Sequence, residues 1–466
     1  MLLALVFGAI FLTTLGALSS VSLTQNKVQN AATGRVKALA IAEAGLEYYR
    51  WFLAHHPGDL TNGTGGPGPY TVPYEDPEGG EGGTITLDIT GTQGCGQVAA
   101  IDIASTGAPH DGNNVTRTLY ARYTQPTVAQ YSYILNDSVW AGGDRIINGP
   151  YHSNGGIRMD GTANAPVSSS LENWLCTSSF GCSPSETVDG VFGNGPNSNL
   201  WTFPEPQLDF SGIAADFSSL KSLAQSNSTY FPRYSSGNKN SAAYWKGYHL
   251  IFNNNGTVTV RRVTSTTRLD VVPVNSAEED WDRALINNET NFSTNTIPSS
   301  CGLIFVEDHV WIEGTVSGKV TLVAANVTTT GVAPNAYLKE NITYADNESG
   351  LTLIAENNVL LTPDSPNVMS LEGVFVAQNG AFGRNLYQNG WSSCHPSYEP
   401  RSSLTIHGTT VSNKRTGTRW VNGCGWSGDA GYQSRVDAFD RRLATDPPPF
   451  TPVVSEDYEF VDWREE

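Results

Sequence analysis

The first 26 residues of this 466-residue chain carry no charged side chain, and this apolar start limits the fold more than any other feature. Residues 1–23 alone are long enough to cross a bilayer as a helix, which takes roughly 20 residues. Residues 24–53 continue a helical pattern, because apolar side chains recur at steps of three and four until His55-His56-Pro57-Gly58 ends it. We predict one helix over residues 1–56, apolar at 1–26 and amphipathic beyond.

A helix of this length cannot be covered by one small domain. It would be on the order of 80 Å long, so we expect its apolar half to bury against partners outside its own domain. Lys27, Arg35 and Lys37 follow that half, and the positive-inside rule applied to the sequence as it stands leaves the remainder in the cytoplasm. If a short basic leader precedes Met1 and is removed after insertion, the remainder is exported instead. We therefore expect Met1 to be a processed N-terminus.

The composition is that of a loop-rich β protein. The chain contains 47 Gly and 25 Pro, and only 15% of its residues are charged. Its formal net charge of −18 gives an acidic surface that repels DNA, RNA and anionic lipid heads. We therefore expect no nucleic-acid partner.

Alternating apolar and polar residues predict a small antiparallel β-sheet after the helix. Three such stretches lie at residues 84–90, 98–105 and 116–123, inside a small β domain at 57–127. Residues 57–83 are rich in Gly and Pro, and we predict that they form a loop.

Residues 128–466 are predicted to form one large all-β head, which makes the fold class α+β. Short apolar pulses separated by Gly, Asn, Asp and Thr recur between residues 303 and 411, as in a parallel β-helix, whose inward side chains stack from rung to rung. Because the repeat is degenerate, a β-sandwich is the alternative. Residues 168–248 are interpreted as irregular insertions. Helical spacing predicts two short helices, at 210–225 and 277–287.

The six cysteines are candidates for three disulfides. The candidate pairs are Cys176 with Cys182, which close a short loop, Cys394 with Cys424, and, by elimination, Cys95 with Cys301. The cysteine spacing does not match a zinc site. Disulfides would imply an oxidising compartment, and reduced core cysteines are the alternative.

Ten Asn-x-Ser/Thr sequons are present, a pattern that accepts glycans in exported proteins. A chain this rich in Asn and Thr yields many of them by chance. The glycosylation candidates are Asn114, Asn136, Asn227, Asn255, Asn326 and Asn341.

The order of these features resembles a known family. An uncharged half-helix, an amphipathic half that contains Ala42-Glu-Ala-Gly-Leu-Glu47, and a β-rich head are similar to mature type IV pilins, in particular to large pilin-like proteins. The resemblance covers residues 1–125. It implies that a prepilin peptidase removes a leader, that the new N-terminus is methylated, and that an assembly machinery packs subunit helices into a filament core. Most type IV pilins carry Glu at the fifth mature position, whereas this chain has Leu5.

The resemblance assigns roles to the two halves of the helix. The assembly residues would be Met1, Leu5, Phe7, Gly8, Phe11, Leu15, Leu18 and Val21. The residues that dock the helix onto the β domain would be Val36, Leu39, Leu46 and Tyr49. Because Thr, Ser and Gly weaken a helix and cluster at residues 13–22, we predict an interruption of the helix within residues 13–24.

The sequence contains no strong signal for catalysis. We find no GxSxG, HExxH or phosphate-binding loop, and the histidines lack metal-ligand spacing, so we expect no enzyme activity, metal or cofactor. Glu307-Asp308-His309 is the most reactive-looking triplet, and we interpret it as a solvated turn. Six tryptophans in polar loops could form carbohydrate-stacking platforms or pack in interfaces: Trp174, Trp201, Trp245, Trp391, Trp420 and Trp426.

The leading functional prediction is a structural subunit of an extracellular filament on the cell surface, a homo-oligomer assembled from the cytoplasmic membrane. The alternative is a membrane-anchored, monomeric surface adhesin or carbohydrate-binding protein, with host or surface glycans as partners. The third prediction is a polysaccharide lyase or hydrolase, because parallel β-helices include such enzymes.

Overall fold

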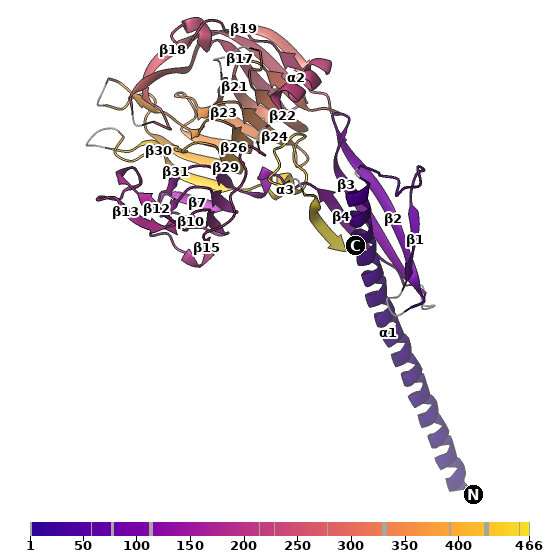
Figure 1. Cartoon of the computed structure of the whole chain (residues 1–466). Helices are drawn as coiled ribbons and strands as arrows, with labels where there is room; N and C mark the ends of the chain where they lie inside the picture. The colour runs from indigo at the N-terminus through magenta and orange to yellow at the C-terminus, as the bar shows by residue number, and fades with distance from the viewer. Residues whose placement is uncertain are drawn as a thin grey trace. The chain divides into compact units, whose positions relative to one another are not determined.

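The computed structural model describes residues 2–56, 58–75, 79–110, 115–213, 215–227, 229–276, 278–328, 333–390, 393–423, 428–455 and 457–465. The chain divides into two compact units (Figure 1). The first unit comprises Met1–Gln93, Val98–Thr124 and Tyr458–Glu466, and the second comprises Gly94–Gln97 and Gln125–Asp457.

The N-terminal helix α1 (Leu2–His55) runs without a break, which confirms the predicted long helix (Figure 1). The predicted interruption within residues 13–24 is wrong. The hydroxyl groups in this stretch are satisfied inside the helix, because Thr14 donates to the Ile10 carbonyl (3.0 Å) and Thr24 donates to the Ser20 carbonyl (2.8 Å). With its hydroxyl groups bonded in this way, the polar cluster is compatible with a regular helix.

A five-stranded sheet completes the first unit, and it confirms the predicted small antiparallel sheet. Its order is β1-β2-β3-β4-β32, and the pairs β1–β2, β3–β4 and β4–β32 are antiparallel. The strands are β1 (Tyr70–Glu75), β2 (Glu81–Gly94), β3 (Gln97–Pro109), β4 (Arg117–Thr124) and β32 (Glu459–Glu465). Strand β1 lies inside residues 57–83, so the prediction of a loop there is wrong. Strand β32 lies in the first unit, although the predicted head at 128–466 includes it.

The second half of α1 packs closely on this sheet. Its buried residues recur at helical spacing: Ala38, Ile41, Ala42, Leu46, Tyr49 and Leu53. Two glycines permit the close approach, because a Cβ on Gly107 would lie 2.1 Å from the Ala38 carbonyl oxygen and a Cβ on Gly45 would lie 2.2 Å from Ser105 Oγ. Gly45 belongs to the Ala42–Glu47 stretch that carries the family resemblance. Close packing against the sheet therefore explains why this stretch contains a glycine.

The second unit is mostly β. Its earlier strands are β5 (Tyr133–Leu135), β6 (Val139–Ala141), β7 (Arg145–Asn148), β8 (Tyr151–Ser153), β9 (Ile157–Met159), β10 (Thr162–Ala163), β11 (Val167–Ser169), β12 (Asn173–Cys176), β13 (Glu186–Asp189), β14 (Val191–Phe192), β15 (Trp201–Thr202) and β16 (Tyr230–Phe231). Its later strands are β17 (Gly247–Asn253), β18 (Thr257–Val272), β19 (Asp280–Thr296), β20 (Leu303–Val306), β21 (His309–Val316), β22 (Lys319–Ala324), β23 (Ala336–Tyr344), β24 (Gly350–Ala355), β25 (Val359–Leu361), β26 (Val368–Ala377), β27 (Phe382–Gly383), β28 (Leu386–Gln388), β29 (Arg401–Ser412), β30 (Arg419–Trp420) and β31 (Ala430–Ala438).

Two parallel ladders organise this unit. One runs β20-β22-β24-β26-β29, and the other runs β17-β21-β23-β25-β27. Side chains in register stack from strand to strand, as Leu322, Leu353 and Phe375 do in one buried core. Their neighbours Val323, Ile354 and Val376 stack in a second core on the opposite face of the same strands. The large all-β head is confirmed; parallel pairing favours a β-helix over an antiparallel sandwich, and the β-helix stays a prediction.

Two predicted helices have different outcomes. Helix α2 (Phe217–Ser226) begins later than the predicted 210–225, because the Asp216 side chain accepts hydrogen bonds from the backbone N–H groups of Ser218 and Ser219 and caps the helix there. The helix predicted at 277–287 is wrong. Most of that stretch lies in β19, which pairs with β18 in a long antiparallel hairpin. The second unit also contains a short helix, α3, which spans Arg441–Thr445.

Two of the predicted disulfides are formed. Cys176 bonds to Cys182, and Cys95 bonds to Cys301. Cys424 lies outside the described residues, so its pairing with Cys394 stays a prediction.

We predict that Gly107→Ala destabilises the first unit. The added Cβ would lie 2.6 Å from the Ala42 backbone nitrogen as well as against Ala38, so the helix backbone must move. Such overpacking costs about 1–3 kcal/mol. In the control Gly66→Ala, the added Cβ meets nothing within 4 Å. Hydrogen exchange of the β3 amides in the purified chain measures the difference. Equal protection in both variants would contradict the close packing of helix and sheet.

Candidate assembly surface

The first half of α1 has no covering from its own chain in the part that the structure describes. Every side chain from Leu3 to Asn30 is exposed. Leu3 and Leu5 are 72% and 71% exposed, and the exposed large apolar side chains of residues 3–26 are Leu3, Leu5, Val6, Phe7, Ile10, Phe11, Leu12, Leu15, Leu18, Val21 and Leu23. Exposure of such a surface to water is unfavourable in free energy, because transfer of apolar groups out of water is favourable.

The apolar side chains surround the helix rather than form one stripe. At 3.6 residues per turn, the exposed side chains of Leu3, Leu5, Val6 and Leu15 lie at about 0°, 200°, 300° and 120° around the axis, so they point in different directions. A helix that is apolar all round is normally buried in a large core or in a membrane. Among the described helices, α1 is long and apolar enough to span a membrane by length and composition.

Small side chains on α1 leave room for another backbone. A Cβ on Gly8 or Gly16 would meet nothing within 4 Å. A shallow groove of about 410 Å³ runs along one side of the helix and is lined by Ser20, Val21, Thr24, Gln25, Val28, Gln29 and Ala32. Small residues such as Gly8, Gly16, Ser20 and Ala32 allow two helices to approach closely.

The predicted assembly and docking residues separate along α1. Leu5, Phe7, Gly8, Phe11, Leu15, Leu18 and Val21 are all exposed, and Met1 lies outside the described residues. Leu46 and Tyr49 are buried against the sheet, and Leu39 packs at the edge of that cluster. The docking role predicted for Val36 is wrong, because its side chain is 69% exposed. The docked face instead begins at Gly34 and Ala38.

The glycosylation candidates differ in accessibility. Asn136, Asn255 and Asn341 are exposed, and Asn227 and Asn326 are half-buried. Asn114 lies outside the described residues. The Asn136 Nδ2 donates to Asn413 (2.8 Å), whereas Asn255 uses only its Oδ1, which accepts from Thr257. The exposed Asn341 also uses only its Oδ1, which accepts from the Ser370 N–H (2.8 Å). Asn255 and Asn341 are therefore the candidates whose amide nitrogens are best presented.

The interpretation of Glu307-Asp308-His309 as a solvated turn is wrong. All three side chains are buried. Asp308 accepts hydrogen bonds from the backbone N–H groups of Tyr234 (2.8 Å) and Ser235 (2.7 Å), and burial raises the pKa of Asp308. Each member of the triplet has its own partners in the fold, so the arrangement does not form a catalytic triad.

The predicted tryptophans serve different purposes. Trp174 packs against the Cys176–Cys182 disulfide, and the Trp420 Nε1 donates to the Arg384 carbonyl (3.0 Å). Trp201 packs against a buried cluster. Trp391 and Trp426 lie outside the described residues.

Trp245 lines a pocket together with residues that the sequence did not single out, among them Trp281, Asn335, Asn357 and Asn385. These residues come from separate strands and loops, so no spacing in the sequence marks them as a set. The only available signal is that Asn recurs in the turns between the apolar pulses.

Among solved structures, the chain is similar to the crystal structure of the competence-associated pilin ComZ from Thermus thermophilus. The match covers 93% of this chain and 98% of that chain, with 12% identity and a TM-score of 0.32. No family model and no curated protein matches the chain. A similarity at this level carries no inference about function, which has to come from the geometry of the chain itself.

We predict that Glu307→Gln makes the second unit less stable at neutral pH and less sensitive to acid. Burial alone would raise the pKa of Glu307, but hydrogen bonds from Tyr230, Lys221 (2.9 Å) and Thr328 (2.7 Å) hold it below its ordinary value of 4.5. The ionised form therefore stabilises the fold above that value, and the contribution is lost as the pH falls through the lowered pKa.

The expected loss at neutral pH is about 1–3 kcal/mol, because the buried partners of the carboxylate lose hydrogen-bonding strength. The control is Glu279→Gln, since Glu279 is exposed. Thermal unfolding at neutral and acid pH measures both variants. An unchanged acid sensitivity in Glu307→Gln would contradict the assignment.

Proposed function

We propose that this protein is a structural subunit of a type IV pilus-like filament and that it polymerises through the first half of α1. The observation that supports this proposal most strongly is the complete exposure of an uncharged, apolar helix from Leu3 to Gln25. Packing such helices side by side removes their apolar surface from water. The acidic heads, which contribute to the net charge of −18, remain solvated outside the core.

The size of the apolar surface is sufficient for assembly. Burying one Leu, Val, Ile or Phe side chain stabilises by roughly 1.5–3 kcal/mol, so burying half of the eleven exposed ones contributes roughly 8–16 kcal/mol. That gain is of the same magnitude as the roughly 4–15 kcal/mol that association costs in lost freedom. The balance applies when the helix leaves the membrane, because lipid tails already cover the same surface inside a bilayer.

We also propose a route to the cell surface that uses the same helix. We propose that a leader is removed by a prepilin peptidase, that the subunit rests in the cytoplasmic membrane through residues 1–26, and that the assembly machinery extracts it into the filament. The disulfides Cys95–Cys301 and Cys176–Cys182 support an oxidising location for the head. Methylation of the N-terminus and glycans at sequons such as Asn255 belong to the same proposal.

Leu5 changes how packing would begin. Pilins with Glu at this position carry a charge that can pair with a neighbouring N-terminus. Here an apolar side chain that is 71% exposed occupies the position. We propose that the first contacts between neighbours are apolar, with Gly8 and Gly16 permitting close approach.

A monomeric adhesin anchored by α1 is the second candidate, because the same helix meets the length and composition of a membrane span. It predicts that the protein stays with the membrane when cells are sheared. The filament predicts that the protein appears in the sheared material as ordered fibres under negative-stain microscopy.

We predict that deleting residues 1–26 converts the protein into a soluble monomer. The described residues 3–26 bury no side chain, so the rest of the chain loses no packing. Sedimentation velocity of the purified variant measures its size, and microscopy of sheared material checks for fibres. Fibres formed by the truncated chain would contradict assembly through α1.

A point variant tests the same surface without deletion. Phe11→Asp places a charge in the middle of the apolar half, and burying that charge without a partner costs several kcal/mol per subunit. We expect the fibre yield to fall at least about tenfold, since 1.4 kcal/mol already corresponds to that factor. The control is Leu175→Asp, a substitution at a similarly exposed apolar side chain in the second unit, which is expected to leave the yield unchanged.

A further inference from the structure

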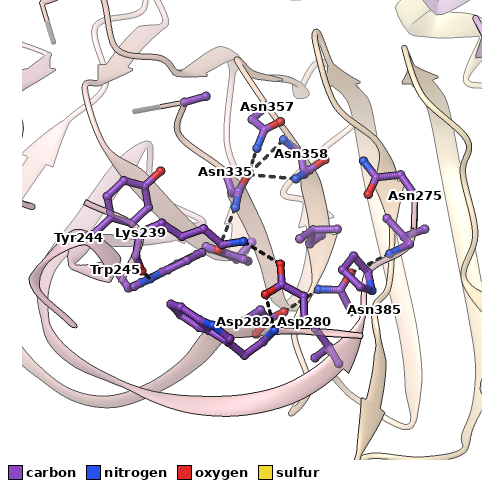
Figure 2. A pocket seen from close by; sticks show the side chains of 17 residues that line it. Lys239, Tyr244, Trp245, Asn275, Asp280, Asp282, Asn335, Asn357, Asn358 and Asn385 are labelled. Carbon is purple, nitrogen blue, oxygen red and sulfur yellow. Dashed lines mark hydrogen bonds and ion pairs between the residues drawn. The ribbon is translucent and has the colours of Figure 1, made fainter. Parts of the chain in front are cut away.

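A pocket of about 220 Å³ lies within the second unit (Figure 2). Its walls come from the short helix Ala242–Trp245, from both strands of the β18–β19 hairpin, and from turns that precede or follow rungs of the parallel ladders. Of its lining residues, Trp245 is among the tryptophans named from the sequence, and the pocket is not part of the assembly surface. The pocket is open to solvent, since Asn275 at its edge is exposed and Lys239 is 54% exposed.

One side of the pocket is aromatic. The rings of Trp245 and Trp281 lie 5.6 Å apart in an edge-on arrangement. The Trp245 Nε1 donates to the Lys239 carbonyl (2.9 Å), and its ring stacks on the buried imidazole of His309 at 5.4 Å. Arg268 lies over the Trp281 ring at 4.8 Å. These contacts fix the orientation of the aromatic rings before any ligand binds.

The opposite side of the pocket is made of side-chain amides (Figure 2). The Asn335 Oδ1 accepts hydrogen bonds from the Nδ2 groups of Asn357 (2.9 Å) and Asn358 (3.3 Å), and the Asn335 Nδ2 donates to the Tyr337 hydroxyl (3.0 Å). The network holds the amides in place and leaves the Asn357 Oδ1 without a partner among the described residues.

Two further polar groups at the pocket make no hydrogen bond within the part of the chain that the structure describes. They are the side-chain amide of Asn275 and the hydroxyl of Tyr244. Together with the Asn357 Oδ1, they provide donors and acceptors along a rim next to the aromatic rings.

The charged groups of the pocket are already compensated. Lys239 Nζ pairs with Asp280 at 2.7 Å. Asp282 accepts hydrogen bonds from the Ala284 N–H (3.0 Å) and from the Asn385 Nδ2 (2.6 Å), and burial raises the pKa of Asp282. A ligand therefore meets amides, a hydroxyl and aromatic rings rather than an unpaired charge.

We propose that this pocket binds one or two residues of a neutral carbohydrate. A pyranose ring has an apolar face of C–H groups, which are attracted to the electron-rich face of an indole, and a rim of hydroxyl groups, which pair with amides. The pocket volume is smaller than the roughly 300–1,000 Å³ of sites for drug-sized ligands, which fits a short sugar rather than a long chain. The net charge of −18 disfavours acidic sugars. This proposal does not depend on filament assembly.

The test uses the full chain in a detergent without a sugar headgroup, because a glycoside detergent would compete for the pocket. Glucose, galactose, mannose and N-acetylglucosamine are titrated separately, and binding is measured by tryptophan fluorescence and by saturation-transfer NMR. N-acetylneuraminic acid and adenosine are the charged and the aromatic comparison ligands. We expect saturable binding of at least one neutral sugar with a Kd on the order of 1 mM.

Variants locate the binding to the pocket. Trp281→Ala removes an aromatic wall and is expected to weaken binding at least about tenfold. Tyr244→Phe and Asn275→Ala remove groups that have no hydrogen bond in the described fold, so they leave stability unchanged and are each expected to weaken binding several-fold. The matched control is Asn254→Ala, an exposed amide in the β17–β18 turn, which is expected to bind as the wild type does.

Each outcome either supports or overturns the proposal. Binding that is weakened in Tyr244→Phe and Asn275→Ala but kept in Asn254→Ala supports the proposal. The proposal is overturned if no neutral sugar binds, if these two folded variants bind as tightly as the wild type, or if N-acetylneuraminic acid or adenosine binds as tightly as the best neutral sugar.

Discussion

The apolar half of α1 must be buried, and the described residues of its own chain do not bury it. The same continuous helix serves two different partners along its length. Its second half is fixed to the five-stranded sheet by a close approach that Gly45 and Gly107 permit, so its first half projects as a regular helix with apolar side chains in all directions. A membrane can satisfy this surface, and so can other copies of the same helix. We propose that the subunit is transferred from the membrane to a filament made of such copies.

The topology assigns the proposed assembly helix and the large β unit to different parts of the chain. The sheet that holds α1 is completed by β32, and the large β unit is built almost entirely from the chain between β4 and β32. The head is therefore an insertion into the sheet rather than an appended tail. Substitutions in its turns, including those around the polar pocket, can change the proposed sugar site without touching the residues that pack α1 on the sheet. The stacked parallel strands supply a scaffold on which such turns are held in fixed positions.

The sequence predicted the parts of the fold that depend on neighbouring residues. The charge-free stretch and the three- and four-residue spacing are local signals, and they predicted α1; alternation predicted β2, β3 and β4. Strand β1 was missed because it contains Pro73 and lies among Gly and Pro residues, and such a strand is tolerated at a sheet edge, where β1 lies. Strand β32 was missed because its partner β4 is distant in the sequence. The pocket could not be predicted, because stacking of the ladders brings Asn335, Asn357 and Asn385 together from separate turns.

We propose that the first half of α1 forms the core of a filament. Cryo-electron microscopy of fibres sheared from cells that produce the protein tests it directly. We expect a core of packed helices that accommodates residues 3–30, with the β units on the outside and with apolar side chains in contact around Leu5. A fibre whose core is made by the β units, or in which residues 3–30 stay exposed to solvent, would contradict it.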